Sequence, residues 1–217
     1  MILYHGSQAK NVTPTYGLGA THHDFGAGFY LTDAKDLARE WAVYTPNGRD
    51  GFVHAYELNL DGLKVHDFRN SSVLAWVAEL MKHRDASDTD VYRRRAREFV
   101  RKYAEAVEDA DVIVGWRADA SYFYIVKMFV RDEVGVECMP ELLHLGGFGL
   151  QYVLKSSKAY SHLKIAGAVE SVEYAKYHAA YEERDLAARE KMRDLIADAN
   201  FNRLERLFTD TIKEAAQ

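Results

Sequence analysis

The chain has 217 residues, of which 48% are apolar and 12% aromatic, enough for one packed domain with an appendage. Its 28 basic and 33 acidic side chains leave a net charge of −5, which argues against a strong general affinity for nucleic acid but allows a local basic patch. Cys138 is the single cysteine, which excludes an intrachain disulfide, a C-x-x-C redox pair and a cysteine-based zinc site. We expect Cys138 to be a small buried hydrophobe.

The segment Met1–His5 has no basic leader followed by an apolar stretch, so it does not predict a signal peptide. No apolar run approaches the about 20 residues of a membrane span. We therefore expect a cytoplasmic protein with no membrane partner. The sequence also lacks a Rossmann fingerprint, a Walker loop, a nucleophile elbow and a His-Glu-x-x-His motif, which excludes the usual form of those classes.

The first part of the chain predicts three strands, a long loop and a helix. Strands are expected at Ile2–His5, Gly28–Thr32 and Val53–Leu58, where β-branched and aromatic residues gather. Residues 6–28, rich in Gly, Thr, Asn and His, predict a loop. Asp33 is predicted to cap the helix that follows the second strand. The apolar stripe of that helix consists of Leu37, Ala38, Trp41 and Ala42.

The middle of the chain mixes helices with short buried strands. The predicted helices are Ser72–His83, Val91–Val107, Ala120–Val130 and a turn near Pro140–Leu145. The predicted strands are Asp111–Gly115, Leu150–Leu154 and Lys164–Val172. Residues 146–149 predict a glycine-rich loop, and Ser156 and Ser157 are predicted to cap a short helix that ends near Leu163.

One predicted helix, Val91–Val107, carries a concentration of basic side chains. They are Arg93, Arg94, Arg95, Arg97, Arg101 and Lys102. Such a face can contact phosphates, but a solvated helix surface is the more common role, and that is the one we expect.

From about residue 173 the composition changes, because glycine and proline vanish and Ala, Glu, Lys, Arg and Leu dominate. Apolar residues recur there at helical spacing, with a predicted break at residues 200–202. We expect a domain at residues 1–172 and a helical extension at 173–217 that packs on the domain as a hairpin. The alternative is an exposed surface for a partner. Short strands at both ends with helices between them predict an α+β fold and not a regular βαβ alternation.

Two segments carry residues that are unusual for a purely structural role. Tyr4-His5-Gly6-Ser7 combines an imidazole and a hydroxyl with a glycine that lets a ligand approach the backbone. Residues 24–32, Asp-Phe-Gly-Ala-Gly-Phe-Tyr-Leu-Thr, place two glycines before an aromatic pair, as in a loop that wraps a flat ligand and then feeds a strand. A turn and two core aromatics would give the same pattern.

Taken together, the two segments resemble motifs of ADP-ribosyltransferases of the diphtheria-toxin and poly-ADP-ribose-polymerase branch. The sequence is similar above all to bacterial ADP-ribosyltransferase-like domains, which share both motifs and an Ala-x-x-Trp-Ala helix, here residues 38–42. In that family a later Gln opens a strand before a short helix, and Gln151 to Leu163 fits this pattern. The resemblance covers about residues 1–166. It implies an ADP-ribosyltransferase-like split β-sandwich with inserted helices.

The resemblance also implies a role for each matching residue toward NAD⁺, which would be the substrate. His5 would hold the adenosine-side ribose, the Gly6 backbone would pair with the nicotinamide carboxamide, and Ser7 would lie beside that amide. Tyr30 would stack on the nicotinamide ring, with Phe29 supporting the strand. The ring would then leave and give an oxocarbenium-like centre that a nucleophile attacks.

The sequence departs from much of that branch at Gln151, where a glutamate is common. Gln can accept a hydrogen bond from a ribose hydroxyl but has no base function. Polymer elongation is therefore not expected, whereas transfer of a single unit is. Glu141, Asp119 and Glu57 are candidates for a substitute carboxylate.

The function we expect is that of an NAD-dependent mono-ADP-ribosyltransferase, with Gln151, Tyr30 and His5 in the catalytic site, acting as a bacterial or phage-defence toxin. Two alternatives stay open: a catalytically weak NAD-binding interaction module and an NAD glycohydrolase toxin. The acceptor is a macromolecule, protein or nucleic acid, and an antitoxin or other partner protein could dock on the C-terminal helices. No metal is expected, because His22 and His23 are adjacent on an extended segment and point to opposite sides.

Overall fold

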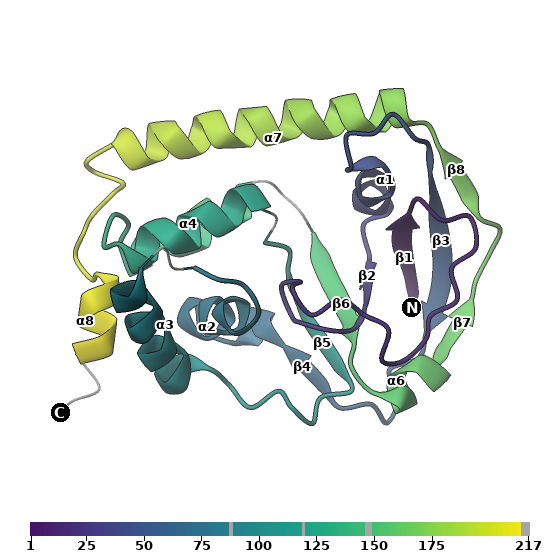
Figure 1. Cartoon of the computed structure of the whole chain (residues 1–217), viewed down its shortest axis with the longest axis horizontal. Coiled ribbons are helices and arrows are strands. Elements are labelled where there is room, and N and C mark those ends of the chain that lie inside the picture. Colours follow the sequence, from purple (N-terminus) through teal and green to yellow (C-terminus); the bar gives the residue numbers. More distant parts are fainter. Residues whose placement is uncertain (87–88, 119, 146–148, 214–217) are drawn as a thin grey trace.

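The computed structural model describes residues 1–86, 89–118, 120–145 and 149–213 and has mixed α and β structure (Figure 1). The strands are β1 (Ile2–Ser7), β2 (Phe29–Thr32), β3 (Gly51–Leu58), β4 (Val65–Asp67), β5 (Val112–Trp116), β6 (Leu150–Leu154), β7 (Leu163–Ile165) and β8 (Glu170–Val172). The helices are α1 (Lys35–Val43), α2 (Val73–His83), α3 (Asp90–Tyr103), α4 (Ala120–Val130), α5 (Met139–His144), α6 (Ser157–Ser161), α7 (Tyr174–Ala197) and α8 (Phe208–Lys213). Short 3₁₀ helices lie at Phe68–Asn70 and Val136–Cys138.

The strands form one sheet in the order β4-β5-β6-β2-β1-β3-β7, with β8 also pairing with β3. The β4–β5 pair is parallel and the other pairs are antiparallel. β1 pairs with β3 along its whole length, from Ile2 opposite Glu57 to Ser7 opposite Phe52. Its pairing with β2, in contrast, is limited to Tyr4 opposite Thr32. The sheet is therefore nearly split between β1 and β2.

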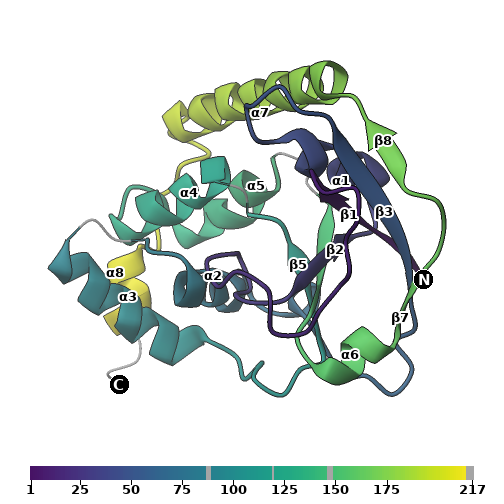
Figure 2. The ribbon, with the colours of Figure 1, turned by 45° about the vertical axis from the view of Figure 1, so that its right-hand side comes forward.

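The sheet curls so that its two halves enclose a common apolar core. Leu3 of β1 and Leu58 of β3 belong to the same buried cluster as Val112 of β5 and Leu154 of β6. These residues alternate along their strands with residues on the opposite face of the sheet, as the period of a strand requires. The larger core lies on the other face of β5 and β6, where Ile113 and Val153 pack beneath helices α2 to α5. Figure 2 shows these helices gathered on that side of the sheet.

Helix α1 covers the outer face of β1 and β3 at very close range. A Cβ added to Gly6 would lie 1.9 Å from the carbonyl oxygen of Ala38, and one added to Gly51 would lie 2.3 Å from that of Ala42. Any larger side chain would push α1 off the sheet. Gly6 is thus required by the packing of this helix.

Most of the predicted elements are confirmed, including the strands at the N-terminus and at Leu150–Leu154 and the helix Ala120–Val130. Ser156 caps α6, accepting a hydrogen bond from the amide of Ala159 at 3.1 Å. Cys138 is buried, as expected, and its thiol donates to the carbonyl of Phe201.

Several predictions about element limits are wrong. β1 runs on to Ser7, because β3 begins at Gly51 and pairs with the extra residues. Asp33 does not cap α1: the cap is Ala34, which makes no side-chain cap bond, and its amide donates to the hydroxyl of Thr32. The helix predicted to Val107 ends at Tyr103. The strand predicted at Lys164–Val172 is two short strands, β7 and β8, which pair with different ends of β3.

The C-terminal helices lie on the body of the protein at separate places and do not form the predicted hairpin (Figure 1). α7 contacts α1, and α8 contacts α3 and α4. Ala188 and Met192 of α7 and Phe208 of α8 are buried in the larger core. The boundary between residues 172 and 173 stays a prediction. Within the described residues no helix combines the length and apolar character needed to cross a membrane.

The burial of Phe208 predicts that α8 unfolds together with the rest of the protein. Phe208 is 0% exposed and its ring lies 5.1 Å from that of Phe99. Replacing Phe208 by Ala should reduce the free energy of unfolding by about 3 kcal/mol or more, measured by chemical denaturation. Leu204→Ala is the control, because Leu204 is 51% exposed and should cost less than about 1 kcal/mol. Equal effects of the two substitutions would contradict this account.

Candidate functional site

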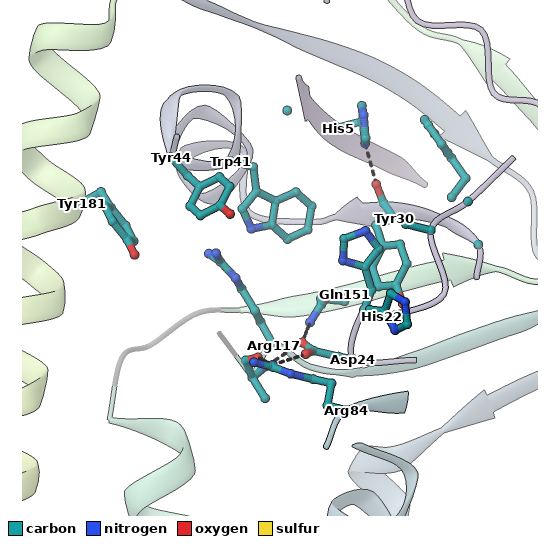
Figure 3. A pocket seen from close by; sticks show the side chains of 17 residues that line it. His5, His22, Asp24, Tyr30, Trp41, Tyr44, Arg84, Arg117, Gln151 and Tyr181 are labelled. Atoms are coloured by element: carbon teal, nitrogen blue, oxygen red, sulfur yellow. Dashed lines mark hydrogen bonds and ion pairs between the residues drawn. The ribbon is translucent and has the colours of Figure 1, made fainter. Parts of the chain in front are cut away.

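A cavity of about 470 Å³ lies beside the split between β1 and β2 (Figure 3). It is enclosed by the ends of β1, β2 and β6, by α1 and α7, and by the loops around residues 19–28 and 117–118. The residues that line it are His5, Gly6, Gly19, Ala20, His22, His23, Asp24, Gly28, Phe29, Tyr30, Trp41, Tyr44, Arg84, Arg117, Ala118, Gln151 and Tyr181. It therefore brings together His5, Tyr30 and Gln151, which the sequence separates widely.

His5 reaches across the split in the sheet. Its Nδ1 lies 2.8 Å from the carbonyl oxygen of Tyr30. Because a carbonyl can only accept, Nδ1 carries the proton and Nε2 is left as an acceptor. Burial lowers the pKa of His5; the bond to Tyr30 opposes that shift, and nearby His54 adds to it. The ring, packed 4.5 Å from that of Phe29, is thus a neutral imidazole of fixed orientation.

Tyr30 is held by the loop that precedes its own strand. Its hydroxyl donates to the carbonyl of Gly26 at 2.7 Å and accepts from the amide of Phe25 at 3.0 Å. Gly26 has a φ of +70°, so this turn suits glycine. Burial raises the pKa of Tyr30 far above its usual range, which keeps the phenol protonated. Tyr30 therefore offers the cavity an aromatic face and not a base.

Lys155 fastens the same loop from the end of β6. Its ammonium donates to the carbonyls of Phe25 at 2.6 Å and Ala27 at 2.7 Å. Burial lowers the pKa of Lys155, and the charge of Glu79 opposes that shift. Residues 25–27 of the loop are thus held by two side chains, Tyr30 of β2 and Lys155 at the end of β6.

Gln151 is oriented by a buried carboxylate. Gln151 is 3% exposed, and its Nε2 donates to Oδ2 of Asp24 at 2.8 Å. Since an ionised carboxylate only accepts, the NH₂ group must face Asp24 and the carbonyl oxygen must face away from it. Gln151 is thereby fixed as a hydrogen-bond acceptor, which is the capacity it shares with a glutamate.

Asp24 has partners on each side and is not a spare base. It is 7% exposed and accepts from Arg84 at 2.8 Å, from the amide of Ala118 at 2.9 Å and from Gln151. Arg84 in turn donates to the carbonyl of Ala118 and lies 4.1 Å above the ring of Phe123. Together they fix the floor of the cavity and place a guanidinium there.

Residues that the sequence reasoning missed form much of the remaining wall. Arg117 extends into the cavity 5.5 Å from the ring of Trp41, and Tyr44 and Tyr181 lie beyond it (Figure 3). Asp24 and Trp41 belong to the sequence motifs at residues 24–32 and 38–42, but no sequence pattern linked Arg84, Arg117 or Tyr181 to those motifs. The cavity thus combines two guanidinium groups with aromatic rings.

Of the other predicted site residues, some line the cavity and some do not. Gly6 and Phe29 line the cavity. Ser7 is not among the lining residues, and its hydroxyl accepts from the amide of Ala9. Glu57 and Glu141 are exposed and lie elsewhere, whereas Asp119 is outside the described residues.

His22 and His23 both line the cavity, and His23 packs 5.1 Å from Tyr30. In the described part of the chain, no three His, Cys, Asp or Glu side chains gather in a way that could hold a metal ion.

The Asp24 contacts predict that its charge is needed for folding. Asp24→Asn leaves Arg84 without a carboxylate partner, which should cost about 3 kcal/mol of unfolding free energy in chemical denaturation. Asp36→Asn is the matched control: Asp36 also pairs with an arginine, Arg39, but is 86% exposed at its side chain and should cost less than about 1 kcal/mol. A mild effect at Asp24 would contradict its place at the centre of the floor.

The lowered pKa of His5 predicts an acid-sensitive contribution to stability. Below its ordinary pKa of 6.5, the unfolded imidazole takes up a proton that the folded one resists, so stability falls as the pH falls. The unfolding free energy should therefore drop between about pH 7.5 and about pH 5.5, and His5→Gln should reduce that drop. An unchanged drop in the variant would show that His5 ionises equally in both states.

Comparison with known proteins gives one relationship. No curated protein matches the chain, and no solved structure matches it. One family matches residues 1–165, a stretch that ends with β7 and contains every strand that lines the cavity. Tyr181, on α7, lies beyond that stretch. The chain belongs to the family described as "Protein of unknown function (DUF3990)".

Proposed function

We propose that this protein is an NAD-dependent mono-ADP-ribosyltransferase whose site is the cavity beside the β1–β2 split. The observation that carries the proposal is the meeting of His5, Tyr30 and Gln151 in one cavity, each held in a fixed orientation by neighbouring groups. These are the three residues whose motifs resemble those of ADP-ribosyltransferases. The fold we propose is the split β-sandwich of that class, which the near separation of β1 from β2 supports.

The chemistry of the cavity suits a dinucleotide with a pyrophosphate. Its volume falls within the about 300–1,000 Å³ typical of small-molecule sites. Arg84 and Arg117 are suited to the two phosphate charges, because a guanidinium binds phosphate oxygens in a planar fork. Nε2 of His5 can accept from a ribose hydroxyl. Tyr30 and Trp41, on opposite sides of the cavity, can hold a flat cationic ring between them (Figure 3).

In the proposed reaction the bond between the ribose C1′ and the nicotinamide nitrogen breaks, and nicotinamide leaves with the electron pair. The ribosyl centre that remains is positively charged until a lone pair of the acceptor forms the new bond to C1′. The acceptor then loses its proton to water. The Gln151 carbonyl oxygen would accept from a ribose hydroxyl and hold the sugar, with its dipole directed at the developing charge.

The cavity contains no unpaired carboxylate among the described residues, since Asp24 is bonded to Arg84, Ala118 and Gln151. A sugar hydroxyl, which needs a base to become a good nucleophile, is therefore a poor acceptor, and the proposal is limited to transfer of single units. We propose a bacterial or phage-defence toxin role from the resemblance alone. A neutralising partner on α7 or α8 stays a prediction.

The lack of an unpaired carboxylate among the described cavity residues also favours a second candidate function, an NAD-binding module that turns its ligand over weakly or not at all. In that role the paired Asp24 and the neutral Gln151 would fix a binding site without driving departure of nicotinamide. A glycohydrolase that uses water as the acceptor would need the same base as a sugar hydroxyl and is less favoured.

Incubation with NAD⁺ labelled in its adenosine part tests the proposal. We expect release of nicotinamide, measured by chromatography, and a labelled macromolecule when cell extract is present. Tyr30→Ala should slow release by more than about 100-fold, because a loosely placed substrate loses rate of that order. Ser7→Ala, outside the cavity, should stay within about threefold.

Three other outcomes would decide against transfer. Saturable NAD⁺ binding by calorimetry without nicotinamide release would establish the binding module. Release of free ADP-ribose with no labelled macromolecule in several extracts would establish the glycohydrolase. If the folded protein neither bound NAD⁺ nor released nicotinamide, every NAD-based hypothesis would be overturned.

A further inference from the structure

A second cavity of about 460 Å³ adjoins the first. The two share His22 and Arg84, and the second is also lined by His83, Asp85, Phe123, Tyr124 and Lys127. Arg84 therefore stands between them, held to Asp24 on one side and packed on Phe123 on the other. A molecule lying in the second cavity would reach the proposed ribosyl centre past Arg84 and His22.

The exposed arginines of α3 lead away from this second cavity. α3 has six basic and two acidic residues within Asp90–Tyr103. Arg93, Arg94, Arg97 and Arg101 are exposed. Arg97 lies four residues from Arg93, three from Arg94 and four from Arg101, so the four share one side of the helix, opposite buried Phe99. We call these four residues the arginine track. Arg93 pairs with Asp85 at 3.7 Å, and this pair joins the track to the rim of the second cavity.

The combination of charge and aromatic surface indicates the kind of ligand. Lys127 and Arg84 bring positive charge into the second cavity, where Asp85, already paired with Arg93, is the single carboxylate among the lining residues. Tyr124 is 47% exposed there. Basic side chains that follow a phosphate backbone, interleaved with aromatic rings on which bases stack, are the features by which proteins bind single-stranded nucleic acid.

We propose that the arginine track and the second cavity bind a single-stranded nucleic acid, and that one of its bases is the acceptor of ADP-ribose. The acceptor role rests on the proposed function, whereas the binding surface does not. A single strand is favoured over a duplex because a base must leave its stack to enter a cavity of this kind.

The absence of an unpaired carboxylate among the described cavity residues favours the same acceptor. Lysine and arginine side chains are protonated near neutral pH and must lose a proton before they can attack. Ring and amino nitrogens of nucleobases are neutral there. Such a nitrogen would bond to C1′ as the bond to nicotinamide breaks, and any proton it carried would pass to water afterwards. Gln151 suffices for this step, since it only has to orient the ribose.

Binding is tested by fluorescence anisotropy with dye-labelled single-stranded RNA and DNA oligonucleotides over a range of salt concentrations. Arg94→Ala combined with Arg97→Ala should weaken binding by about tenfold and lower the salt slope by about 1.4, two contacts at about 0.7 each. The control, Lys191→Ala with Arg193→Ala, removes the same charge from exposed positions of α7 and should change binding less than about twofold. Equal effects of the two double variants, or no binding of either oligonucleotide at low salt, would overturn the proposed nucleic-acid-binding surface.

The acceptor is tested with labelled NAD⁺ and extract, followed by digestion. We expect label that nuclease removes and protease does not, and much less of it in the arginine-track variant, while binding of NAD⁺ measured by calorimetry stays the same. Label removed only by protease would overturn the nucleic-acid acceptor and leave the proposed function standing. Track-dependent binding without transfer to any macromolecule would overturn the acceptor role together with the proposed function, and leave the surface.

Discussion

The candidate site depends on the nearly complete separation of β1 from β2. A carbonyl inside a sheet normally bonds to the next strand, but beyond Tyr4 and Thr32 the two strands diverge. The carbonyl of Tyr30 is satisfied by the imidazole of His5. That bond bridges the split, fixes the tautomer of the ring and leaves an acceptor nitrogen at the cavity. A backbone carbonyl that has no partner in the neighbouring strand thus determines the orientation of His5 at the cavity.

On the floor of the cavity, Asp24 orients Gln151 in a similar way. It joins four pieces of the chain, because it lies before β2 and bonds to Arg84 after α2, to Ala118 after β5 and to Gln151 on β6. A buried carboxylate is tolerated only when it is paired and hydrogen-bonded, and these partners meet that demand. One of these bonds also orients the side-chain amide of Gln151. The contacts that allow Asp24 to be buried are therefore the same ones that orient a site residue.

The C-terminal helices belong to this arrangement. α7 is anchored on α1, where His178 donates to the carbonyl of Val43 and Arg184 pairs with Glu40. These contacts hold Tyr181 at the cavity, on the same side as Tyr44, the residue that follows α1 (Figure 3). A segment outside the stretch that matches the family thus contributes to the wall of the candidate site.

The sequence by itself determined the local features: the order of most strands and helices, the cap at Ser156, and the motifs that contain His5, Tyr30 and Gln151. These follow from periodicity and short-range chemistry, which neighbouring residues encode. It misplaced the start of α1, because Asp33 is a common cap residue but Ala34 takes the cap position and donates its amide to Thr32. It also merged β7 and β8 into one strand, because their separation appears only in their pairing with opposite ends of β3. Only the tertiary structure decided that Gly6 serves the packing of α1, that Asp24 orients Gln151, and that Arg84, Arg117 and Tyr181 join the cavity. Those roles depend on contacts between residues far apart in the chain, and no local pattern records which distant side chain a buried charge will meet.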